Sequence, residues 1–191
     1  MQRKTVILVT GVPGTGKTTT SRLLAESLRG KHLDVSEFAL KNNLVERLDE
    51  KRGTKIVNMK ALRSEIKKLL KPQTILVIDG HYSPDLIEPY LVSKVIVLRK
   101  APWILRDELE LRGYSQAKIR ENVEAELVGS CLQDALDHQD NEKVCELDST
   151  NTTPEEIVKQ IALILKGDKQ CLYGVIDWMS DPKTELLLKE M

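Results

Sequence analysis

The first residues of chemical interest form a loop near the start of the chain. Gly11-Val12-Pro13-Gly14-Thr15-Gly16-Lys17-Thr18 has the spacing G-x-x-x-x-G-K-T. Glycines at these positions let backbone N–H groups turn inward around phosphate oxygens. Lys17 can then reach the β- and γ-phosphates, and the Thr18 hydroxyl can ligate Mg²⁺. The alternative is a tight turn without a ligand. An apolar run before the loop and an apolar-periodic helix after it favour a nucleoside triphosphate site, with ATP and Mg²⁺.

An acidic residue follows another apolar run. The segment from Ile75 to Asp79 is typical of a strand that ends in a carboxylate, which holds Mg²⁺ directly or through water. Asp79 could instead cap the loop at Gly80, and both roles can hold together. Because a phosphate-binding loop is present, we expect Thr18 and Asp79 to form the metal site.

His81 lies two residues beyond Asp79 and can reach the same phosphates from any compact loop. A neutral imidazole could position an attacking water or the acceptor; alternatively, it is a loop histidine that is hydrogen-bonded to the backbone. His32 and His138 have no comparable context.

Three arginines follow the fourth predicted strand: Arg99, Arg106 and Arg112. Arg112 is the strongest candidate for stabilising a transferring phosphoryl group, because Gly113-Tyr114 can form a hinge and basic residues follow it in a lid-like segment. For Arg99 and Arg106 a solvated or ion-paired helix face is the preferred interpretation.

Alternating strands and helices must position these groups. Strands are predicted at 5–9, 32–35, 74–79, 92–98 and 144–147. Helices are predicted after the loop, after Ser36 as a cap, and from about residues 59, 102, 115 and 153. Pro72 should break the chain, and residues 41–55 predict a mobile, solvated insert. The alternation predicts an α/β P-loop nucleoside triphosphate hydrolase fold with a parallel sheet of about five strands, helices on both faces, and ligands beyond the carboxyl ends of the strands.

Length and composition indicate one compact domain of 191 residues, 41% of them hydrophobic. The 29 basic and 29 acidic side chains cancel, which excludes a global positive field for nucleic acid. Cys131, Cys145 and Cys171 contain no C-x-x-C pair, so we expect neither a disulfide framework nor a zinc site, as in a reducing cytosol or nucleus. No apolar run approaches the roughly eighteen residues of a membrane span, so we expect a cytoplasmic protein without a membrane partner.

Together these residues resemble the adenylate kinase isoenzyme 6 family, also described as coilin-interacting nuclear ATPases and, in archaea, as adenylate kinases. The likeness spans residues 4 to about 166. It is carried by the loop from Gly11 to Thr19, by Asp79-Gly80-His81, by Val97-Leu98-Arg99, and by Leu111-Arg112-Gly113-Tyr114-Ser115 followed by Glu121-Asn122.

The resemblance implies a nucleoside monophosphate kinase-like fold and phosphoryl transfer from Mg-ATP to AMP. It also implies a side ATPase activity and a role in small ribosomal subunit maturation, with a ribosomal protein and pre-ribosomal RNA as partners. Carried over by position, the residues that contact ATP are Gly14, Gly16, Lys17, Thr18, Thr19 and Arg112, and those that serve catalysis are Lys17, Asp79, His81 and Arg112.

The resemblance further divides the single domain into regions. The core comprises 1–35, 57–111 and 123–167, the monophosphate-binding region lies at about 36–56, and the lid lies at about 112–122. Residues 168–191 form a C-terminal tail, whose apolar Ile176, Trp178 and Leu186 to Leu188 could dock on the body.

One position departs from the family pattern. Where members carry an arginine near the start of the monophosphate-binding region, this chain has Leu40, with Lys41 beside it. Lysine supplies a point charge but not a bidentate fork for phosphate. The leading hypothesis is an adenylate kinase, and the alternative is an ATP-driven assembly factor with little kinase activity. A GTPase would need an N-K-x-D segment to read its base, which the sequence lacks.

Overall fold

Five short strands form one parallel sheet in the computed structural model, which describes residues 5–49, 54–71 and 74–190. The strand order is β2-β5-β1-β6-β7. All neighbouring strands are parallel, so their carboxyl ends meet at one edge. The strands are β1 (Thr5–Thr10), β2 (Lys31–Asp34), β5 (Ile75–Asp79), β6 (Val92–Arg99) and β7 (Val144–Asp148). The predicted strands and their parallel arrangement are confirmed.

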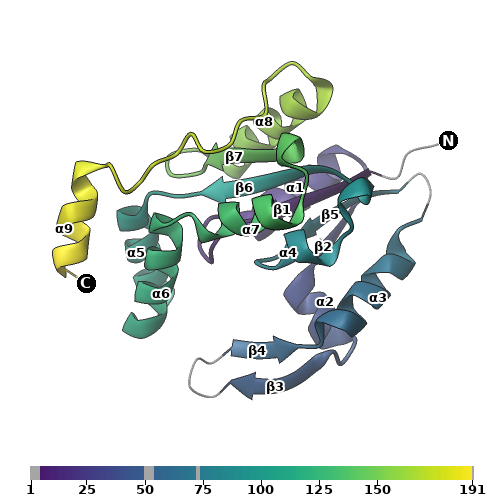
Figure 1. Cartoon of the computed structure of the whole chain (residues 1–191), viewed down its shortest axis with the longest axis horizontal. Coiled ribbons are helices and arrows are strands. Elements are labelled where there is room, and N and C mark those ends of the chain that lie inside the picture. Colours follow the sequence, from purple (N-terminus) through teal and green to yellow (C-terminus); the bar gives the residue numbers. More distant parts are fainter. Residues whose placement is uncertain (1–4, 50–53, 72–73, 191) are drawn as a thin grey trace.

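Helices cover both faces of this sheet (Figure 1). Ile7 and Val9 of β1 point to one face, which α1 (Lys17–Ser27) and α8 (Pro154–Lys166) cover. Val6 and Leu8 point to the other. That face is covered by α2 (Val35–Lys41), α3 (Met59–Leu69), α4 (Ser83–Leu86), α5 (Pro102–Leu111), α6 (Gln116–Leu127) and α7 (Ser130–His138), with short 3₁₀ turns η1 (Pro89–Leu91) and η2 (Asn141–Lys143) beside them. None of the helices in the described ranges has the length and apolar character needed to cross a membrane.

Side-chain caps begin several of these helices. Thr153 and Glu156 form a reciprocal capping box at the start of α8, where the sequence predicted that a helix begins. The cap predicted for α2 is wrong: Asp34, rather than Ser36, accepts a hydrogen bond from the Glu37 N–H. Asp34 takes this place because β2 runs directly into α2. The break predicted at Pro72 lies outside the described residues.

The prediction for residues 41–55, a mobile and solvated insert, includes no regular element. The structure instead has a two-stranded antiparallel hairpin, β3 (Val45–Asp49) and β4 (Thr54–Val57). It stands away from the main sheet in Figure 1. The residues of these two strands are largely polar and show no regular apolar alternation, so the sequence pattern did not reveal them.

The C-terminal tail returns along β7 and ends in α9 (Pro182–Glu190) beside α5. The Glu146 N–H donates to the Leu172 carbonyl at 2.7 Å, and this return brings Cys171 to Cys145, where the two form a disulfide with a Cα–Cα distance of 4.9 Å. The prediction that no disulfide forms is therefore wrong, because spacing along the chain could not show where the tail returns. Trp178 packs on the core and Leu187 is buried in it, as expected for docking, while Leu186 and Leu188 are exposed.

Candidate active site

The phosphate-binding loop connects β1 to α1 at the carboxyl edge of the sheet. Gly11 and Gly14 have φ angles of 142° and 100°, which residues other than glycine rarely adopt. A Cβ on Gly11 would also lie 2.5 Å from the Leu98 carbonyl oxygen. Gly16 precedes α1 without a side-chain cap, so the first N–H groups of the helix remain directed toward the loop. This is the arrangement that binds an anion.

Lys17 begins α1 and lies over this loop. Its Nζ donates to the Val12 carbonyl at 3.0 Å. Burial lowers the pKa of Lys17, an effect that nearby acidic groups, including Asp79, partly offset. An anionic ligand would favour the charged ammonium in the same way. The Lys17 ammonium group therefore lies at the loop, and its contact with phosphate oxygens stays a prediction.

Asp79 of β5 contacts side chains of β2 and of α1, the helix that follows the loop. It is the last residue of β5 and only 2% exposed. Its Oδ2 accepts a hydrogen bond from the Thr18 hydroxyl at 2.8 Å, which brings the two predicted metal-site residues together. Its Oδ1 contacts Nε2 of His32. Sequence reasoning found no such context for His32, which lies beside Asp79 because β2 pairs directly with β5.

His81 follows Asp79 and lies behind the loop. It has a hydrogen bond with the Gly11 backbone, and its Nδ1 lies 3.4 Å from the Cys131 Sγ. Burial and the charge of Lys17 lower the pKa of His81, so its imidazole is neutral at pH 7. The backbone contact agrees with one predicted alternative, and the neutral ring beside Lys17 is what the other requires.

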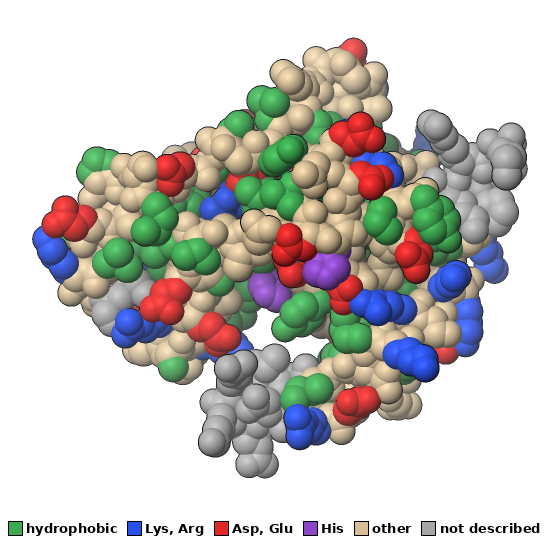
Figure 2. Space-filling model, in the orientation of Figure 1, with side chains coloured by type: hydrophobic (Ala, Val, Ile, Leu, Met, Phe, Trp, Pro, Cys, Tyr) green, Lys and Arg blue, Asp and Glu red, His purple; other side chains and the backbone are tan. Residues whose placement is uncertain are grey.

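A cavity of about 520 Å³ lies next to this cluster. Gly80 packs against Val35 in its wall, and the Tyr82 ring contacts His81 edge-on with centroids 5.1 Å apart. Figure 2 shows the molecule hollowed between its body and the hairpin. The cavity, called the acceptor cavity below, is lined by residues of α2, the hairpin and α3 together with two tyrosines and a lysine: Val35, Ser36, Leu40, Val45, Val57, Met59, Leu62, Tyr82, Tyr114 and Lys118.

Arg112 is not part of the cluster around Asp79 in the described structure. It ends α5, its side chain is 54% exposed, and its Nη2 lies 3.9 Å from Glu108 one turn earlier. Gly113 with φ 74° and Ser115, which caps α6, complete an exposed corner between the two helices. A role for Arg112 and for a lid at 112–122 stays a prediction, as does the contact of exposed Thr19 with ATP.

Comparisons with known proteins show which family this chain belongs to. A family model described as "AAA domain" matches residues 7–129. A Pyrococcus abyssi protein named "Putative adenylate kinase" is 42% identical over 173 residues, 91% of each chain. The chain belongs to the "Putative adenylate kinase" family. A Saccharolobus solfataricus member with the same name is 36% identical over 189 residues, covering 97% of this chain and 94% of that protein.

A solved structure shares the fold of this family member. Shikimate kinase from Bacteroides thetaiotaomicron superposes with a TM-score of 0.61, covering 85% of this chain and 98% of that one. The sequence identity is only 17%, so the likeness concerns the fold alone. The predicted α/β P-loop fold is confirmed.

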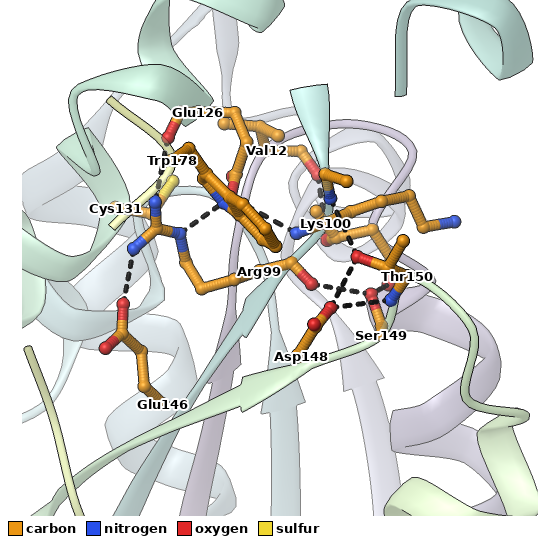
Figure 3. A network of polar contacts seen from close by, with 12 residues as sticks. Val12, Arg99, Lys100, Glu126, Cys131, Glu146, Asp148, Ser149, Thr150 and Trp178 are labelled. Carbon is orange, nitrogen blue, oxygen red and sulfur yellow. Dashed lines mark hydrogen bonds and ion pairs between the residues drawn. The ribbon is translucent and has the colours of Figure 1, made fainter. Parts of the chain in front are cut away.

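Arg99 of this family member lies at the end of β6, only 2% exposed, in a buried network (Figure 3). Its Nε and Nη2 donate to the Glu126 side chain and carbonyl at 2.7 and 2.8 Å, and Nη1 contacts Glu146. Trp178 of the tail donates to the same Glu126 oxygen at 2.9 Å. The prediction of an ion pair is right for Arg99, but its position on a helix face is wrong. Arg106 is on a helix face and pairs with Glu190 at 2.6 Å.

Further residues near the loop were missed by sequence reasoning. Ser149, after β7, donates to the carbonyl of Thr15 or of Arg99, at 3.0 and 2.9 Å, and so braces the loop. Its position directly after a strand end was the available signal, because the carboxyl ends of parallel strands meet at the edge of the sheet where the loop lies. Cys131 carried no such signal, because α7 brings it to His81 only in three dimensions.

Proposed function

We propose that this protein is an adenylate kinase that transfers a phosphoryl group from Mg-ATP to AMP and forms two ADP. The observation that carries the proposal is the convergence of Lys17, Thr18 and Asp79 at one sheet edge, directly beside the acceptor cavity. The name of the relatives, which match over nearly the whole chain, supports the same reaction.

The residues of the donor side fit a magnesium ion held jointly with phosphates. A hydroxyl has one proton and two lone pairs, so Thr18 can donate to Asp79 while a lone pair ligates the metal. Asp79 would then help to hold the metal, directly or through water. Mg²⁺ usually takes few protein ligands and keeps waters and substrate phosphates. When bound, it would neutralise charge on the transferred group.

On the acceptor side, the cavity suits a nucleoside monophosphate. Its apolar wall and the rings of Tyr82 and Tyr114 would bury and stack a base. Lys118 is the one cation among the described lining residues and would attract the phosphate. Arg112, at the corner beside Tyr114, would approach the phosphates when α5 and α6 move toward the loop.

His81 would position the acceptor, or a water when the acceptor is absent. Its neutral ring lies beside Lys17 and against Tyr82 of the cavity wall. A water that occupies the acceptor position accounts for the side ATPase activity included in this proposal. The finer assignment to the isoenzyme 6 type rests on Asp79-Gly80-His81 and Arg112-Gly113-Tyr114.

The experiment is an acceptor panel with the purified chain. ADP formation from Mg-ATP is followed with AMP, CMP, UMP, GMP or no acceptor, and Lys17→Ala serves as the inactive control. We expect AMP to raise turnover well above that of ATP alone. If none of the monophosphates raises it, the kinase assignment fails.

A second candidate is an ATPase that gates assembly with a ribosomal protein or pre-ribosomal RNA. One observation favours it: Leu40 lines the acceptor cavity, while the neighbouring Lys41 is exposed and pairs with Glu37 at 2.9 Å. The phosphate of AMP would thus lack an arginine at this position. Capture of a small-subunit ribosomal protein that depends on bound ATP or ADP would support this candidate, and capture that ignores the nucleotide would count against it.

A further inference from the structure

Three side chains form a chain of contacts from the edge of the sheet to the loop. His32 on β2 contacts Asp79 Oδ1, and Thr18 on α1 donates to Asp79 Oδ2 at 2.8 Å. The His32 and Asp79 side chains are 17% and 2% exposed. Both oxygens of a buried carboxylate are therefore engaged, each by a different element of the fold.

The proton positions follow from the chemistry of the groups. An ionised carboxylate only accepts hydrogen bonds, so His32 Nε2 is a donor to Asp79 Oδ1. With its two oxygens held, the carboxylate cannot rotate about its Cβ–Cγ bond without losing a charge-assisted hydrogen bond. The Thr18 hydroxyl donates to this fixed acceptor, which fixes the direction of its remaining lone pairs.

His32 also separates Asp79 from solvent. The imidazole lines a surface hollow of about 220 Å³ on the outer side of β2, together with Asp34, Glu37, Phe38, Lys41 and Leu69. Water entering from this hollow would compete for Asp79 Oδ1. The ring occupies that path and supplies the hydrogen bond itself.

We propose that His32 is a positioning residue for the metal site. By holding Asp79, it fixes the direction in which Thr18 presents its oxygen to Mg²⁺. Groups that orient metal ligands in this way commonly change metal affinity by about 10- to 100-fold when removed. The inference rests on the proposed function, because it takes Thr18 and Asp79 as the metal-binding residues.

The test measures binding rather than turnover. Calorimetry compares the affinity for a non-hydrolysable ATP analogue in Mg²⁺ with the affinity in EDTA, and the ratio is the magnesium-dependent gain. We expect His32→Phe to reduce this gain by about 10- to 100-fold. His32→Gln should retain most of it, because its amide nitrogen extends as far as Nε2, whereas the shorter side chain in His32→Asn should not.

His138→Phe is the matched control, since His138 is 39% exposed and pairs with Asp85 away from the loop. It should leave the gain unchanged. Thermal unfolding of each variant tests whether it is folded. If His32→Phe is not folded, the comparison of the magnesium-dependent gain of His32→Asn with that of His32→Gln decides the question.

Asp79→Asn completes a double-mutant cycle. If His32 acts through Asp79, His32→Phe should cost little more in the Asp79→Asn background. This inference alone would be overturned if wild type shows the magnesium-dependent gain and His32→Phe and His32→Asn keep it. It would also be overturned if the effects of His32→Phe and Asp79→Asn on the gain are fully additive. A wild type without any magnesium-dependent gain would overturn it together with the magnesium part of the proposed function.

Discussion

Replacing Arg99 with methionine should destabilise the protein strongly. Arg99 donates through three nitrogens to Glu126 and Glu146, and all three side chains are at most 3% exposed. In Arg99→Met both carboxylates stay buried, and Glu126 keeps only Trp178 and the Lys100 N–H as donors. Removing one partner of such a buried pair costs about 3–5 kcal/mol. This is a large fraction of the stability of an ordinary domain.

Urea unfolding followed by circular dichroism measures this cost, with Arg106→Met as the control. Arg106 also pairs with a glutamate, Glu190 at 2.6 Å, but the two side chains are 25% and 49% exposed. Its loss should lower the free energy of unfolding by less than about 1 kcal/mol. If the two variants differ by less than about 1 kcal/mol, the argument from burial is refuted.

The pH dependence of Arg99→Met gives an internal check. Burial raises the pKa of Glu126, so the folded protein binds its proton at a higher pH than the unfolded chain does. The free energy of unfolding therefore falls as the pH rises through this range. Without Arg99 to hold the charge, the effect is larger, and the deficit of the variant relative to wild type should shrink as the pH is lowered from 7 toward 5.

Three further predictions concern the site and the cysteines. Lys17→Ala should abolish turnover because phosphate charge is no longer neutralised, whereas His81→Ala should lower hydrolysis more than ATP binding; equal loss of binding by calorimetry would contradict these separate roles. Burial raises the pKa of Cys131 from 9.0 to about 11, so the folded protein keeps a proton that the unfolded chain loses. The free energy of unfolding should thus fall by up to about 2–3 kcal/mol as the pH rises between these values, and urea titrations of Cys131→Ala should lack this fall. Reduction of the Cys145–Cys171 bridge, which spans 26 residues, should cost about 3 kcal/mol; identical unfolding curves with and without reductant would show that the bridge does not constrain the chain.

The sheet and the donor side could be predicted from the sequence because local patterns determine them. The apolar run before Gly11 and the run that ends at Asp79 are continuous, as in strands buried on both faces. Residues that follow such strands meet at one edge of a parallel sheet, which brings Thr18 and Asp79 together.

The missed features depend on which segments become neighbours. His32 lies beside Asp79 because β2 pairs with β5, and strand order is not a property of either segment alone. Cys171 meets Cys145 because the tail returns along β7. The hairpin forms because β3 pairs with β4, and the polar residues of the two strands carry no apolar period that would show this pairing in advance.

The most direct test of the proposed reaction follows the transferred phosphoryl group itself. ATP labelled at the γ-phosphate is incubated with the protein and Mg²⁺, with and without AMP, and the labelled products are separated. We predict that AMP directs the label into the β-phosphate of ADP and that Lys17→Ala does not. Label that appears only as inorganic phosphate, at a rate unchanged by AMP, would contradict the assignment as an adenylate kinase.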